Sequence, residues 1–220
     1  MNADHRVTKY LPSTLSASES DAFVDRLTEH HKLHGYTFWA VEVCEPIRGS
    51  QRGTSPFVGF VGLQQPRYSM PFEHEQPLVE VGWRLAPEWW GLGIATEAAA
   101  VSLTFAWNAL KLNQVVSYTV PPNLPSQAVM QRIGMSYVGM FNHPDGGLKW
   151  WAPHALYRAR RGLNDTGARP NGTRSDRAVD VRQQSLTSVR PRMSVSVADS
   201  SVLGIPAQWT THEDFPERRR

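Results

Sequence analysis

The stretch from Val79 to Ala98 constrains the fold more than any other, because it combines a strand, a glycine-bearing turn and a helix start. Apolar residues dominate from Val79 to Leu85, and Gly91 and Gly93 then precede an alanine-rich segment. Neither glycine has a Cβ, so the backbone there can approach a bulky group closely. The unpaired amides and the positive dipole end of the following helix favour an anion. This stretch predicts a phosphate-binding site at a strand-to-helix junction.

Two common phosphate-binding patterns do not fit these glycines. A P-loop requires a lysine and a Ser or Thr directly after its last glycine, and no lysine follows here. A dinucleotide fingerprint requires a third glycine, where the chain has Thr96, and an acidic residue about 20 positions later. The chain reads Asn113-Gln114-Val115-Val116 in that later region. A nucleotide-dependent oxidoreductase is therefore a disfavoured alternative, which NAD binding without CoA binding would revive.

A third pattern fits better. The segment Trp90-Gly91-Leu92-Gly93-Ile94-Ala95 resembles the Q/R-x-x-G-x-G/A pyrophosphate loop of the GNAT superfamily of N-acetyltransferases. The small residues match at Gly93 and Ala95, whereas Trp90 replaces the usual Gln or Arg. The longer run Trp-Gly-x-Gly-x-Ala-Thr-Glu-Ala is similar to the ribosomal-protein-alanine acetyltransferase (Rim) branch of that superfamily.

A second segment supports the same resemblance. Residues 123–135 resemble the Asn-x-x-Ser-x-x-x-x-x-x-x-Gly-Phe/Met segment of the Rim branch, at a distance that fits a helix plus one strand. The resemblance runs from about Asn2 to Arg160 and is most specific between Glu80 and Met135. The strand and helix with which relatives usually open have no counterpart before residues 2–7. Either the true start lies upstream of Met1, or the chain folds with a shortened sheet that has an exposed edge.

The resemblance implies acetyl-CoA as the acetyl donor, without a metal, and direct attack by an amine within a ternary complex. The backbone amides from Gly91 to Thr96 would hold the pyrophosphate, and the end of the strand at Leu85 would pair with the pantetheine arm. Leu92 stands where the branch often has Lys or Arg, so we expect weaker cofactor binding. The implied cofactor-binding residues are Leu85, Trp90, Gly91, Leu92, Gly93, Ile94, Ala95, Thr96, Asn123 and Ser126.

The same resemblance assigns roles after the glycine loop. Asn123 corresponds to an asparagine that contacts the pantetheine, and Ser126 to a serine that can act as general acid toward the CoA sulfur. The alternative for Ser126 is a helix N-cap, a position that serine suits well. Tyr118 and Tyr137 are other possible proton donors, but their strand positions favour core packing.

Glu80 is the candidate general base, acting directly or through water. It lies on the strand before the glycine loop, and its neighbours Val79 and Val81 indicate a partly desolvated carboxylate. Burial would raise its pKa toward the range in which a carboxylate accepts a proton near neutral pH. The alternative is a structural carboxylate paired with Arg84 or Arg67.

The pattern along the chain predicts an α/β fold with a GNAT-like mixed, mostly antiparallel sheet flanked by helices. Residues 1–161 would form one acetyltransferase domain, and residues 162–220, where apolar residues thin out, a disordered tail. Expected helices are 16–34, beginning near a Ser18 cap, 93–110 and 126–133 with Gly134 as its left-handed end. Expected strands are 37–43, 57–63, 78–85, 115–120, 136–141 and 155–160.

Composition narrows the compartment and the partners. The chain has 220 residues, one cysteine and a formal net charge of +3. No stretch reaches the roughly 20 apolar residues of a membrane span, so a cytoplasmic protein is expected, without membrane or nucleic-acid binding. Cys44 is expected in a strand core rather than as a nucleophile.

The expected partner is an amine acceptor, either a small molecule or a protein N-terminus, and the chain would be a monomer or a homodimer. A non-catalytic acyl-CoA-binding module is the alternative function.

Overall fold

The computed structural model describes residues 1–47, 49–72, 78–145 and 152–162. These residues form a twisted sheet of six strands in the order β1-β2-β3-β4-β6-β5. The strands are β1 (Phe38–Val43), β2 (Ser55–Gln64), β3 (Glu80–Leu85), β4 (Gln114–Thr119), β5 (Ser136–Asn142) and β6 (Pro153–Arg160). The helices are α1 (His5–Thr8), α2 (Ala17–His34), α3 (Ile94–Asn108) and α4 (Leu124–Arg132), with a 3-10 turn η1 (Pro87–Trp89). The predicted tail lies outside the described residues, except for residue 162.

The sheet is antiparallel except at one junction. The β1–β2, β2–β3, β4–β6 and β5–β6 pairs are antiparallel, and β3 pairs with β4 in parallel. The predicted mixed, mostly antiparallel sheet is therefore confirmed. Strands β1 and β5 form its two edges, and within residues 1–47 no strand precedes β1.

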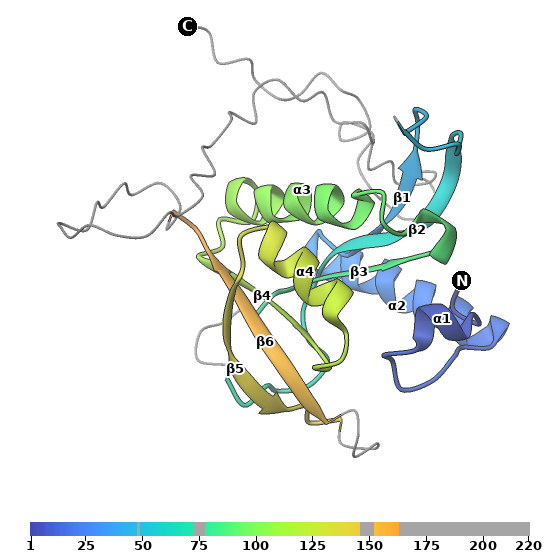
Figure 1. Cartoon of the computed structure of the whole chain (residues 1–220). Coiled ribbons are helices and arrows are strands. Elements are labelled where there is room, and N and C mark those ends of the chain that lie inside the picture. The colour runs from blue at the N-terminus through green and yellow to red at the C-terminus, as the bar shows by residue number, and fades with distance from the viewer. Residues whose placement is uncertain (48, 73–77, 146–151, 163–220) are drawn as a thin grey trace, which may run out of the picture.

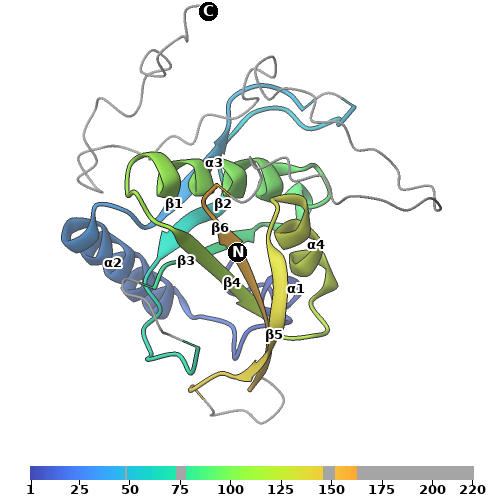
Figure 2. The ribbon, with the colours of Figure 1, turned by 90° about the vertical axis from the view of Figure 1, so that its left-hand side faces the viewer.

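The two faces of the sheet carry different helices. Helices α3 and α4 cover one face, and α1 and α2 lie on the opposite side (Figures 1 and 2). The main core lies between β2, β3 and α3, where Val61, Val81, Leu85, Ala99 and Leu103 are buried. Because side chains alternate along a strand, the even-numbered residues of β3 face the α1/α2 side. Among the described residues, no helix combines the length and the apolar character that a membrane crossing requires.

One helix cap and one cysteine differ from their predicted positions. Ser16, not Ser18, begins α2: its hydroxyl accepts from the Glu19 amide, and the Glu19 carboxylate accepts from the Ser16 amide. This reciprocal pair is a capping box, which satisfies two backbone groups that the helix cannot. Cys44 also differs from the expectation, because it lies one residue beyond β1 and is exposed rather than in a strand core.

The left-handed stop after α4 is confirmed. Gly134 has a φ of +83° and follows Ile133, which ends α4. Its amide donates to the carbonyl oxygen of Gln131 at 3.0 Å, and the Met135 amide donates to that of Met130 at the same distance. Glycine adopts this conformation without a Cβ penalty, so the chain can turn directly into β5.

Candidate active site

The site forms where β3 and β4 separate. Their one described ladder pair joins Glu80 to Val116, and the Val116 amide donates to the Val79 carbonyl oxygen at 2.9 Å. Beyond this pair the strands diverge, and a cavity of about 890 Å³ is lined by residues of both. Its other walls come from α3, α4 and η1 and, on the opposite side, from α1 and the residues that follow it, α2, β1 and β2. A cavity of this size is typical of a small-ligand site.

The glycine turn has the geometry expected of an anion site. Gly91 and Gly93 have φ values of +75° and +85°, and a Cβ on either would meet nothing within 4 Å. The amide of Glu97 donates to the Gly93 carbonyl oxygen at 3.0 Å. The amides of Ile94, Ala95 and Thr96 precede it and therefore have no acceptor within α3. These amides and the helix dipole fit the pyrophosphate of a coenzyme.

Nine of the ten predicted cofactor-binding residues line the cavity, and Leu92 does not. Leu92 is partly buried and packs against the main core, because an apolar side chain gains more from burial than from exposure in the turn. Trp90 lines the cavity and is 48% exposed. Its indole Nε1 donates to the Leu85 carbonyl oxygen at 2.8 Å, which holds the turn against the end of β3.

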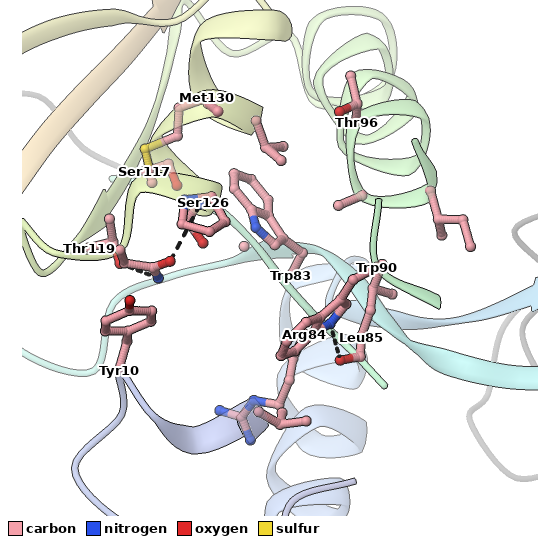
Figure 3. Close-up of a pocket in the computed structure, with 18 of the residues that line it drawn as sticks. Tyr10, Trp83, Arg84, Leu85, Trp90, Thr96, Ser117, Thr119, Ser126 and Met130 are labelled. Carbon is pink, nitrogen blue, oxygen red and sulfur yellow. Dashed lines mark hydrogen bonds between the residues drawn. The ribbon is translucent and has the colours of Figure 1, made fainter. Parts of the chain in front are cut away.

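The start of α4 corrects the interpretation of Ser126 as an N-cap. Asn123 is the N-cap, and its Oδ1 accepts from the Ser126 amide at 3.4 Å. The Asn123 Nδ2 donates to Thr119 Oγ1 at 2.9 Å, so the same side chain also connects α4 to the end of β4. Ser126 is partly buried and lines the cavity, and its hydroxyl has no hydrogen bond within the described part of the chain. Figure 3 shows Ser126 beside Thr119, across the cavity from Tyr10.

Glu80, the first residue of β3, lines the cavity. Desolvation raises the pKa of its carboxyl group from 4.5 to about 7, although a hydrogen bond from the Tyr118 hydroxyl acts in the opposite direction. Tyr118, expected in the core, lines the cavity next to Glu80, and the pKa of its phenol is raised well above 10. Neither Arg84 nor Arg67 forms an ion pair with Glu80 among the described residues. Tyr137 is 55% exposed on the edge strand β5, so its expected core position was wrong.

Sequence reasoning missed the wall opposite α3 and α4. Tyr10 comes from the segment after α1, and Phe23, Phe38 and Phe60 come from α2, β1 and β2. The Phe38 and Phe60 rings stack with centroids 5.7 Å apart, and Phe23 lies 5.2 Å from Phe60. Because side chains alternate along β3, the sequence could have placed Arg84 on the same strand face as Glu80. Nothing local in the sequence indicates the aromatic residues that contact Arg84.

Comparison with known proteins agrees with this architecture. The family model described as the acetyltransferase (GNAT) domain matches residues 1–136, which is more than half of the chain. This protein belongs to the GNAT acetyltransferase family.

Individual relatives match this chain with moderate or low sequence identity. The chain is 35% identical over 74 residues to the uncharacterized N-acetyltransferase YnaD of Bacillus subtilis, a match that spans 33% of this chain and 43% of YnaD. A GNAT-family acetyltransferase structure from Bacillus anthracis is 25% identical, with a TM-score of 0.53 over 72% of this chain and 84% of that one. The ribosomal-protein-S5-alanine acetyltransferase of Vibrio fischeri shares the fold at 19% identity, with a TM-score of 0.53 over 74% and 84% of the two chains.

Proposed function

We propose that this protein is an acetyl-CoA-dependent N-acetyltransferase of the Rim-like branch, formed by residues 1–161, which acetylates a primary amine. The observation that carries the proposal is the single cavity that connects the free amides of the glycine turn with the desolvated carboxylate of Glu80. The fold that it shares with an S5-alanine acetyltransferase agrees with the proposed branch. The acceptor would be a small amine or a protein N-terminus, and a cytoplasmic location agrees with this role.

The coenzyme would be held mainly by main-chain groups. Amides from Gly91 to Thr96 would bind the pyrophosphate, and the open space at Gly91 and Gly93 leaves room for it. The end of β3 at Leu85 and the side chain of Asn123 would bind the pantetheine arm. When bound, the coenzyme supplies an activated acetyl thioester whose carbonyl carbon can accept the amine nitrogen.

Two side chains would move the protons. Glu80, directly or through water, would accept the proton that the amine loses as the C–N bond forms, and a pKa of about 7 suits this transfer near neutral pH. Ser126 would donate a proton to the sulfur as the C–S bond breaks, so that the amine loses one proton and the sulfur gains one. The Tyr118 hydroxyl already donates to Glu80, which favours Ser126 over Tyr118 for this second role.

Calorimetric titration with acetyl-CoA tests the proposal. We expect micromolar binding by the wild-type protein and its loss in Gly93→Trp, because the indole would enter the open space of the turn. Gly35→Trp is a matched control, since Gly35 has a φ of +77°, equally open surroundings and a position outside the cavity. Similar binding by all three proteins, or none by a folded wild type, would refute the coenzyme site. Binding without turnover of any amine would instead identify a non-catalytic acyl-CoA-binding module.

A further inference from the structure

Arg84 is a partly buried cation in the cavity that has no carboxylate partner among the described residues. Its Nη1 donates to the Asn2 side-chain oxygen at 2.9 Å, and its guanidinium lies 5.2 Å from the centre of the Phe60 ring. A second ring, that of Phe23, lies 5.6 Å away. A guanidinium has five N–H donors, and the bond to Asn2 uses one of them. The aromatic faces stabilise the charge but accept no conventional hydrogen bond.

This arrangement leaves a desolvated charge that lacks a counterion. Burial lowers the pKa of Arg84 from 12.5 to about 10, so the group is still charged at neutral pH. Removing a charged group from water is costly unless an opposite charge or several hydrogen bonds replace the lost solvation. The other cations that line the cavity differ: Arg6 is paired with Asp4 at 2.6 Å, and Arg6, Lys9 and Arg132 are all exposed. Arg84 is thus the better placed group for an incoming anion.

The position of Arg84 points to the acceptor rather than to the coenzyme. Arg84 and Glu80 lie on the face of β3 that is turned toward α1 and α2, whereas the glycine turn leads into α3 on the other face. Figure 3 shows the Arg84 side chain extending away from Thr96, on the side of the cavity where Tyr10 lies. A phosphate bound at the turn would therefore not neutralise Arg84.

We propose that Arg84 binds an anionic group of the acceptor, so that the substrate of this enzyme is a small amine that also carries a carboxylate. This inference rests on the proposed acetyltransferase function. The planar guanidinium can donate two parallel hydrogen bonds to a carboxylate, which gives both affinity and orientation. The amine would then lie toward Glu80 and the anion toward Arg84.

Gly82 and the aromatic side chains indicate what lies between the two ends of the acceptor. Gly82 separates Glu80 from Arg84, and each is about 6.6 Å from it along the strand. A Cβ at Gly82 would lie 3.0 Å from the Phe38 ring, so the missing side chain lets this ring pack directly against the strand between Glu80 and Arg84. Phe38 and Phe60 line the cavity along the same stretch. The part of the acceptor between its amine and its carboxylate would therefore contact aromatic rings, which favours an apolar spacer or an aromatic group.

Matched acid and amide acceptors provide the test. The acids are β-alanine, 4-aminobutyrate, 6-aminohexanoate and 4-(aminomethyl)benzoate, each compared with its carboxamide, and 3-aminopropylphosphonate reports whether another anion suffices. For at least one pair we expect the wild type to prefer the acid by about 10- to 100-fold in kcat/KM, the range of a charge-assisted hydrogen bond. Arg84→Gln should remove this preference, so that the ratio of kcat/KM for the acid to that for the amide falls to about 1. Arg84→Lys should retain part of the preference.

A binding measurement gives a second readout that does not depend on turnover. 4-(Acetamidomethyl)benzoate and its carboxamide are titrated into the wild type and Arg84→Gln in the presence of CoA, after acetyl-CoA affinity has been measured for both. Acetyl-CoA binding and amine turnover without preference for any acid would overturn the role of Arg84 and leave the proposed function intact. Absence of both acetyl-CoA binding and turnover would instead refute the proposed function. If Arg84→Gln does not fold, the acid and amide comparison in the wild type still decides the matter.

Discussion

The indole nitrogen of Trp90 donates to the carbonyl oxygen of Leu85 at 2.8 Å and connects the first residue of the glycine turn to the last residue of β3. The short 3-10 turn η1 lies between these two residues, so the segment that joins β3 to the glycine turn is short and ordered. The GNAT resemblance places a Gln or Arg at this position. In this chain, a hydrogen bond from the Trp90 side chain to β3 therefore holds the turn in place, at a position where relatives have the side chain of a Gln or Arg.

Trp90→Phe should weaken acetyl-CoA binding because it removes this hydrogen bond and keeps an aromatic ring. A net hydrogen bond contributes about 0.5–1.5 kcal/mol, which corresponds to a roughly 2- to 13-fold higher Kd if the turn must be re-ordered on binding. Titration calorimetry measures the change. Trp107→Phe, on α3 and outside the cavity, is the matched control and should leave Kd unchanged. An unchanged Kd for Trp90→Phe would mean that the turn keeps its place without the indole.

Glu80 should produce an acidic limb in the pH dependence of kcat/KM. With a pKa of about 7, the carboxylate loses its ability to accept a proton as pH falls, so log kcat/KM should decrease by one per pH unit below about 7. Glu80→Gln should remove this limb and lower kcat/KM by about 10²- to 10⁴-fold. The acceptor amine also titrates, so the profile is measured with two amines of different pKa.

The two sources of such a limb are separated by their response to the acceptor. A limb that follows the pKa of the amine would belong to the substrate, and one that stays near pH 7 belongs to the enzyme. Glu42→Gln, on the edge strand β1, should retain the wild-type profile. A limb near pH 7 that persists in Glu80→Gln would exclude Glu80 as the base.

The same carboxylate should lower the stability of the fold at neutral and alkaline pH. Because folding raises the pKa of Glu80 from 4.5 to about 7, the folded state binds more protons than the unfolded state between these values. Its contribution to the free energy of unfolding therefore falls as pH rises from about 4.5 to 7 and stays low above that. At pH 8 Glu80→Gln should raise the free energy of unfolding by on the order of 3 kcal/mol relative to its effect at pH 4.

Urea unfolding of the wild type and Glu80→Gln at both pH values measures this difference. Comparing the two proteins at the same pH cancels the titration of every other group that the substitution does not touch. An equal effect of the substitution at pH 4 and pH 8 would show that the carboxylate has an ordinary pKa in the folded protein.

The spacing of apolar residues, together with residues typical of helix and strand ends, predicted the main helices and strands to within a few residues. Helix α3 was expected at 93–110 and spans Ile94–Asn108, and β4 was expected at 115–120 and spans Gln114–Thr119. The four-residue helix α1 was missed because it is too short for a repeating apolar pattern. The caps at Ser16 and Asn123 were readable in principle: Glu19 completes a capping box, and Pro125 lies in the first turn of α4.

The glycine turn and Glu80 could be predicted as parts of the candidate site from the sequence, but the residues that surround Glu80 and Arg84 could not. The glycine turn and Glu80 belong to one continuous stretch, and local rules place them on adjacent elements. The contact between Glu80 and Tyr118 depends on the parallel pairing of β3 with β4, which no local pattern specifies. The aromatic surroundings of Arg84 depend likewise on the packing of α2 across the sheet.

Single substitutions at the start of α4 should separate structural support from catalysis. Asn123→Ala removes the N-cap and the bond to Thr119, so we expect a loss of about 1–2 kcal/mol in the free energy of unfolding.

Ser126→Ala removes a hydroxyl that forms no hydrogen bond in the described structure, so stability should change by less than about 0.5 kcal/mol. If that hydroxyl protonates the departing sulfur, kcat should nevertheless fall by about 10²-fold or more. Thermal denaturation and steady-state kinetics on both variants provide the comparison. A stable Ser126→Ala with wild-type kcat would transfer the acid role to another group, and a destabilised one would show that Ser126 supports the helix start after all.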